Sequence, residues 1–189
     1  MGGRRFTFPR FLGAAGRRAL VGLCLLLCLG RGVAATPTPL EVRALYLYNF
    51  SLFVTWPQSA FDAPGAPLRY CVVGNPALAR LLARLVKGEE ARGHPLQLVE
   101  RPSSFENCHL LYLDHSLGER IGRILAAVRA RPVLTVGDSE AFVRAGGMVG
   151  LVRQGRRIRP VIDRAAVAAS RIHISSKLLR LARLIGKEP

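Results

Sequence analysis

Three consecutive residues, Asp114, His115 and Ser116, are of the acid, base and nucleophile types that a hydrolase uses. They follow an apolar run at 108–113, CHLLYL, so we expect them at the carboxyl end of a buried strand, where open α/β sheets bind ligands. Adjacent residues in a turn do not reach one another in the geometry of a catalytic triad. We therefore interpret Ser116 as a helix cap, with Glu119 completing a capping box.

The other acid–base candidates in the sequence are Asp138 and Asp163, and neither has partners at a recognisable catalytic spacing. The sequence therefore predicts a protein that is not an enzyme. It also predicts no cofactor and no resident metal.

Cysteines are the next reactive group. Cys24 and Cys28 lie in an apolar N-terminal segment, which leaves Cys71 and Cys108 as a pair. In an oxidising compartment an even number of cysteines favours a disulfide, and two separate buried thiols are the alternative. A zinc site formed with His109 is a third interpretation, although no C-x-x-C or H-x-x-H spacing supports it.

Candidate contact residues with a ligand or partner are Arg171, His173, Trp56 and Asp163. The segment 171–174 alternates polar and apolar residues, as a half-exposed strand does, and in a strand Arg171 and His173 point the same way. A cation and an imidazole on one face could bind an anion, and surface residues without a function are the alternative. Trp56 is the single tryptophan and serves either as a structural anchor or as a contact with a ligand or partner.

The N-terminus indicates export. Residues 1–35 combine a basic start, a short apolar segment at 19–30 and small residues before a cleavage point after Ala35. We read 1–35 as a cleaved signal peptide and 36–39 as an extended leader, which places the protein in the periplasm. Sec export is preferred, and a twin-arginine signal, a lipoprotein anchor or an uncleaved anchor are the alternatives.

The charge of the chain is strongly basic, with 28 Lys and Arg against 12 Asp and Glu. Six of the arginines lie in the signal segment, and the remaining cations are scattered, with their densest group at 153–159. They form either a solvated surface or a contact with anionic lipid or an acidic partner. Nucleic acid is not expected as a partner of an exported protein.

The elements that position these residues alternate between strand and helix. Apolar runs predict strands at 69–73, 95–100, 108–113, 133–136 and 171–174, and a hairpin over 148–162. Helical periodicity and caps predict helices at 41–54, 77–86, 117–130, 140–144, 164–170 and 175–185. This order predicts an α/β fold over 40–186: a single three-layer domain with a mostly parallel central sheet, a C-terminal hairpin and helices on both faces.

Three of these elements carry more specific expectations. The helix at 41–54 is apolar almost all the way round, which predicts burial on most sides. The strand, Gly74-Asn75 turn and helix at 69–86 are similar to a phosphate-binding unit but contain one glycine where a G-x-G-x-x-G motif needs three. In 131–152 we expect Ser139 to cap a short helix, and Gly146-Gly147 to form a tight exit into the hairpin.

Several segments together resemble the YfiR family of periplasmic proteins. They are ALYLYNFSLFVTWP at 44–57, LRYCVVGN at 68–75, CHLLYLD at 108–114, RPVLTVGDSEAFVRAGGMVGLV at 131–152 and ISSKLLRLARLI at 174–185. The resemblance covers about residues 40–186 and implies an α/β fold that can dimerise and can carry a disulfide. Cys71 and Cys108 lie in blocks that match cysteine-bearing strands. Asp163 departs from the family pattern, which has asparagine there, and Asp caps a helix equally well.

The resemblance implies regulation rather than catalysis. Its best-known member represses an inner-membrane diguanylate cyclase by binding the periplasmic part of that enzyme, which lowers cyclic di-GMP and biofilm formation. We therefore expect a periplasmic repressor whose partner is such a cyclase or a similar membrane receptor, with a possible homodimer. The alternative is a periplasmic module that binds a small anionic or aromatic metabolite.

Overall fold

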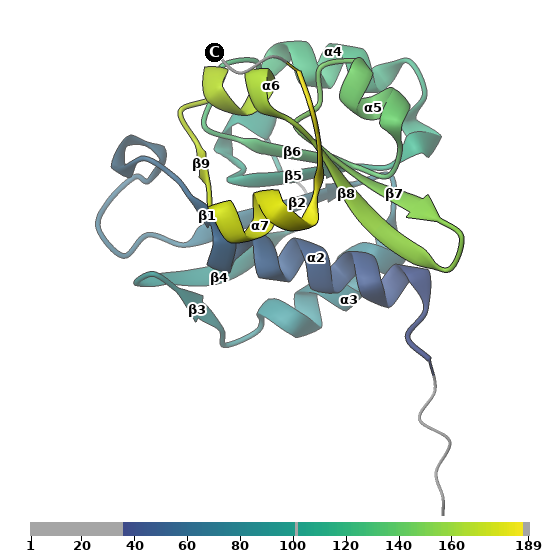
Figure 1. Ribbon diagram of the computed structural model, residues 1–189. Helices are drawn as coiled ribbons and strands as arrows, with labels where there is room; N and C mark the ends of the chain where they lie inside the picture. Colours follow the sequence, from purple (N-terminus) through teal and green to yellow (C-terminus); the bar gives the residue numbers. More distant parts are fainter. Residues whose placement is uncertain (1–35, 101, 187–189) are drawn as a thin grey trace, which may run out of the picture. The chain divides into compact units, whose positions relative to one another are not determined.

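The computed structural model describes residues 36–100 and 102–186, so the predicted signal peptide lies outside the described part (Figure 1). The helices are α2 (Pro39–Phe53), α3 (Pro76–Val86), α4 (Arg120–Ala127), α5 (Glu140–Arg144), α6 (Arg164–Ala169) and α7 (Ser176–Leu181). The strands are β1 (Val54–Thr55), β2 (Leu68–Val73), β3 (Glu90–Ala91), β4 (His94–Val99), β5 (Leu110–Leu113), β6 (Leu134–Gly137), β7 (Val149–Gln154), β8 (Arg157–Asp163), β9 (His173–Ile174) and β10 (Arg183–Ile185). None of the helices in the described ranges is both long and apolar enough to cross a bilayer.

Eight of the described strands form one sheet in the order β10-β8-β7-β6-β5-β2-β4-β3. Its centre, from β4 to β7, is parallel, while β7 and β8 form the predicted antiparallel hairpin. The chain passes from β2 to β4 on one side and later resumes with β5 on the other side of β2. The carboxyl ends of β2 and β5 therefore mark the point where the strand order reverses, which is where doubly wound sheets bind their ligands.

Helices cover both faces of the sheet, as predicted (Figure 1). The side chains of β5 alternate between the faces because successive residues of a strand point in opposite directions. Leu110 and Tyr112 join the core formed by α2 and α3, whereas Leu111 and Leu113 join the core formed by α4 and α5. The α/β class and the three layers predicted from the sequence are confirmed.

Helix α2 begins at Pro39, because Thr38 and Glu41 form a capping box in which each accepts the other's backbone N–H. The helix therefore begins two residues earlier than the predicted start at residue 41. Burial of α2 on most sides is confirmed, and one side is exposed: Leu45 and Leu52 are 50% and 46% exposed. The sheet and α3 cover the other sides of α2, and no described element covers this one.

The segment 131–152 folds as predicted into β6, α5 and β7. The Ser139 hydroxyl accepts a hydrogen bond from the Phe142 N–H and caps α5. Gly146 has φ of +101°, a conformation that glycine adopts without strain. A Cβ on Gly147 would lie 2.1 Å from the Phe142 ring, so this glycine leaves room for the ring to pack.

The helix predicted at 117–130 is shorter, and its cap is different. Asp114, rather than Ser116, accepts the capping hydrogen bond, and it caps a single 3-10 turn at His115–Leu117. Gly118, with φ of +52°, then interrupts the helix, so α4 begins at Arg120. The predicted capping box of Ser116 and Glu119 is therefore wrong.

The C-terminal helix predicted over 175–185 is wrong in its second half. Helix α7 ends at Leu181, and Arg183–Ile185 forms β10, which pairs in parallel with β8. The free edge of β8 offers unpaired backbone groups, and hydrogen bonds to them compensate for the lost helical turn. Leu181, the last residue of α7, is 71% exposed.

Candidate functional site at the carboxyl edge of the sheet

Polar residues of three parallel strands meet at the point where the strand order reverses. Gly74 and Asn75 follow β2, Asp114 and His115 follow β5, and Asp138 follows β6. The strands are neighbours and end at the same edge, so their connecting turns lie side by side. This edge is the candidate functional site.

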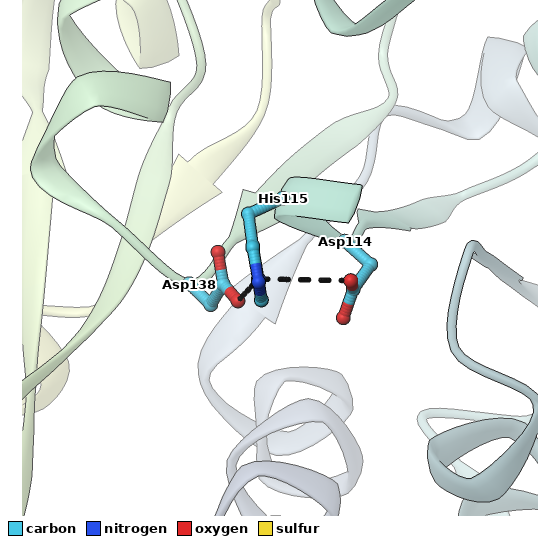
Figure 2. A group of neighbouring side chains, drawn as sticks. All are labelled: Asp114, His115 and Asp138. Carbon is cyan, nitrogen blue, oxygen red and sulfur yellow. Dashed lines mark hydrogen bonds and ion pairs between the residues drawn. The ribbon is translucent and has the colours of Figure 1, made fainter. Parts of the chain in front are cut away.

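His115 and Asp138 form the centre of the site (Figure 2). The His115 Nδ1–H donates to Asp138 Oδ2 at 2.6 Å, and Asp114 Oδ1 lies 3.6 Å from the same nitrogen. The imidazole is 74% exposed, while each carboxylate is 8% exposed. The hydrogen bond that His115 donates to Asp138 and the negative charge of that carboxylate, with a smaller contribution from Asp114, raise the pKa of His115.

Asp114 is held in place by neighbours on both sides. Burial alone would raise its pKa, but hydrogen bonds from the Asn75 side chain at 2.9 Å and the Ser116 N–H at 3.1 Å outweigh burial and lower the pKa. Asn75 also accepts the Leu78 N–H and so caps α3. A Cβ on Gly74 would lie 2.9 Å from Asp114 Cβ, so this close approach of β2 and β5 requires glycine.

Tyr112 and Arg43 lie beneath the carboxylates, on the α2 side of the sheet. Tyr112 is fully buried, and burial, followed by the charges of Asp138 and Asp114, raises the pKa of its phenol. Arg43 of α2 acts on the same phenol in the opposite direction. Within the described residues, neither the Tyr112 hydroxyl nor Arg43 Nε has a hydrogen-bond partner of good geometry.

The arrangement does not form a nucleophilic triad. Ser116 Oγ donates to the Gly74 carbonyl at 3.4 Å and is not paired with His115. Asp114, His115 and Asp138 could each offer one ligand atom to a metal ion, and these atoms lie within 4.8 Å of one another. The His115 proton already lies between the ring and Asp138, and Arg43 brings a positive charge close by, so we assign no metal here.

The sequence predicted Asp114 and His115 at this edge but did not predict the pairing of His115 with Asp138. Asp114-His115 and Asp138 each follow an apolar run that predicts a strand, and this shared position was the signal that could have indicated the pairing. Arg80 and Arg84 of α3 were also missed. Both arginines border a cavity beside the site. The signal in the sequence was their spacing of one helical turn, on the helix that follows the Gly74-Asn75 turn.

The predicted Cys71–Cys108 disulfide is present, with a Cα–Cα distance of 5.9 Å. It lies away from the candidate site, near the amino end of β5. The zinc alternative is wrong because both sulfurs are bonded to each other. The His109 ring is also occupied: Nδ1 accepts the Arg69 N–H and Nε2–H donates to the Ala60 carbonyl.

Trp56 is 7% exposed, and its indole N–H donates to the His109 carbonyl at 3.0 Å. Arg171 and His173 are both exposed, but the strand begins only at His173. Arg171 has φ of +60°, so the extended segment that would align the two side chains is wrong. The short strand β9 pairs with β1, and this local pairing replaces the longer strand.

The Asp163 carboxylate is the N-terminal cap of α6. Its Oδ1 accepts the N–H groups of Ala165 and Ala166 and caps α6, as predicted for a residue that replaces asparagine. None of the four predicted contact residues belongs to the edge site.

Comparisons with known proteins agree with this fold. Residues 40–183 match the YfiR/HmsC-like family. The structure is also similar to the crystal structure of a conserved domain protein from Vibrio cholerae O1 biovar El Tor strain N16961, with a TM-score of 0.55 and 16% identity. The similar region covers 81% of this chain and 62% of that one, and at this identity it shows the fold alone. The family match extends over almost all of the described residues, and the chain therefore belongs to the YfiR/HmsC-like family.

Proposed function

We propose that this protein is a periplasmic regulator that binds the periplasmic part of an inner-membrane diguanylate cyclase and lowers cyclic di-GMP production. The observation that carries the proposal is the family match over residues 40–183. Proteins of this family are periplasmic and regulatory rather than enzymatic. The basic and apolar pattern of residues 1–35 and the Cys71–Cys108 disulfide are consistent with export to an oxidising compartment.

The exposed leucines of α2 are the surface that we assign to the receptor. Leu45 and Leu52 lie two helical turns apart and are both about half exposed, although α2 otherwise packs into the core. Large apolar side chains on one side of a helix are typical of a surface that another protein covers. A regulator that binds by this surface needs no catalytic group.

The test is a pull-down of the tagged mature protein from inner-membrane fractions, with cyclic di-GMP measured in cells that lack the gene. We expect a diguanylate cyclase to be enriched and cyclic di-GMP to rise on deletion. The double variant Leu45→Glu/Leu52→Glu should abolish both capture and repression. Leu85→Glu, at a 37% exposed leucine of α3, is the matched control and should retain both.

Unchanged cyclic di-GMP on deletion, with no cyclase in the pull-down, would contradict the function. Loss of capture by Leu85→Glu to the same degree as by the double variant would contradict the assigned surface.

A further inference from the structure

A cavity of about 770 Å³ lies beside the candidate site, between α3 and the carboxyl ends of β2 and β4. Its apolar wall is formed by Val72, Leu98, Ala79 and Ala83. Its volume is typical of the sites that take small molecules. The two alanines leave open the space that longer side chains on α3 would fill.

The polar wall of the cavity carries two unpaired cations. Arg80 and Arg84 lie one turn apart on α3, and in the described part of the chain neither has a hydrogen bond or an ion pair. Some other arginines form ion pairs: Arg69 with Asp62, Arg131 with Glu106, and both Arg144 and Arg183 with Glu140. Glu100 also lines the cavity, yet it forms no salt bridge with either arginine.

These features select one class of ligand. Guanidinium groups bind carboxylate, sulfonate and phosphate groups through charge-assisted hydrogen bonds. The positive end of the α3 dipole, at Pro76, lies at the same cavity and adds to the attraction for an anion. A small apolar wall opposite two cations suits a molecule with an anionic group and a flat apolar body.

We propose that this cavity binds a small organic anion with a flat apolar body, whose charged group lies between Arg80 and Arg84. The site is separate from the α2 surface assigned to the receptor. It adjoins the carboxyl edge, because Asn75 both lines the cavity and donates to Asp114. An occupant is therefore in a position to alter the hydrogen bonds of Asp114 and, through them, the surroundings of His115.

Two fluorescent probes test the site on the purified mature protein. 8-Anilinonaphthalene-1-sulfonate has the anionic group and the flat body, and N-phenyl-1-naphthylamine has the body alone. We expect Arg80→Gln/Arg84→Gln to weaken binding of the sulfonate at least about tenfold, because two charge-assisted hydrogen bonds are lost, and to leave the neutral probe unchanged. Ala83→Phe should weaken the binding of both probes because the larger side chain occupies the space beside the apolar wall.

The matched control is Arg120→Gln/Arg123→Gln, which removes two exposed arginines from α4 and should leave sulfonate binding unchanged. Equal circular dichroism and thermal midpoints establish that the variants are folded. Sulfonate binding that survives Arg80→Gln/Arg84→Gln, or that falls equally in the α4 control, would overturn the proposal. Sedimentation with anionic vesicles that depends on Arg80 and Arg84, without an effect on the soluble probe, would overturn it in favour of a lipid headgroup.

Discussion

The two ends of strand β5 carry a histidine each, and the two histidines behave in opposite ways. His109, at the amino end, is 1% exposed, and burial followed by the charge of Arg69 lowers its pKa to about 4. The exposed His115, at the carboxyl end, has a raised pKa because Asp138 accepts its proton in a hydrogen bond. The same residue type is therefore a neutral core group at one end and a titrating surface group at the other.

The surroundings explain this difference. At the amino end, the Phe61 ring stacks between His94 and His109, with centroid distances of 3.7 and 4.4 Å, and Trp56 meets His109 edge-on. The Cys71–Cys108 disulfide closes the same region. At the carboxyl end, the strand order reverses, and the helices that follow β2 and β5 lie on opposite faces of the sheet, which leaves polar groups and a cavity accessible. One end stabilises the fold, and the other is available for binding.

Removing the disulfide should produce the largest change. The bond joins residues 37 apart in sequence, and loop-closure entropy predicts that Cys71→Ser/Cys108→Ser lowers the free energy of unfolding by about 4 kcal/mol. Urea unfolding at pH 7 measures the loss, and the wild type in reducing agent is the matched comparison. A loss below about 1 kcal/mol would show that the amino end does not depend on this bond.

Acid should destabilise the protein through His109. The unfolded chain binds a proton near pH 6.5, whereas the folded chain binds it only near pH 4. Neutral His109 therefore contributes fully to the free energy of unfolding above about pH 6.5. Up to about 3 kcal/mol of that free energy is lost as the pH falls towards 4.

Urea unfolding at several pH values, compared with His109→Gln, measures this dependence. The variant should lose the slope between pH 6.5 and 4. A wild-type slope that persists in the variant would assign acid sensitivity to other groups.

Trp56→Phe should lower the free energy of unfolding by a smaller amount, about 1–2 kcal/mol, because the indole hydrogen bond and part of the buried ring are lost. The His109 carbonyl keeps a second donor, the Leu134 N–H, which limits the cost. Thermal unfolding measures the change, with the exposed Leu181→Ala as control. Unchanged stability with lost capture of a membrane partner would make Trp56 a contact residue.

The smallest effect on stability is expected at His115, and its pH dependence is opposite to that of His109. The protonated pair with Asp138 contributes stability below about pH 6.5, and this contribution is lost as the pH rises through the raised pKa. An NMR titration of the His115 ring should show a pKa above 6.5 that decreases in Asp138→Asn. Asp114→Asn, at the longer 3.6 Å separation, should lower it less. Equal decreases in the two variants would show that Asp138 is not the principal partner.

Local patterns predicted most of the helices and strands. Ser139, Asp163 and the glycines of 146–147 act where the sequence placed them, because caps and turns depend on near neighbours. The errors fall where distant segments compete. Residues 183–185 have an apolar helical pattern but form β10, because the edge of β8 needs a partner. Helix α2 is buried on most sides as predicted, but its apolar pattern did not specify that the side with Leu45 and Leu52 would be exposed.

The sequence by itself determined the α/β class, the family and the polar residues that follow β2 and β5. It did so because side-chain periodicity, caps and turns are properties of short segments. Only the tertiary structure decided that Asp138 pairs with His115 and that Arg80 and Arg84 border a cavity. Each of these depends on strand order and on which face of the sheet a side chain meets. Those contacts join residues far apart in the chain, and local periodicity does not specify them.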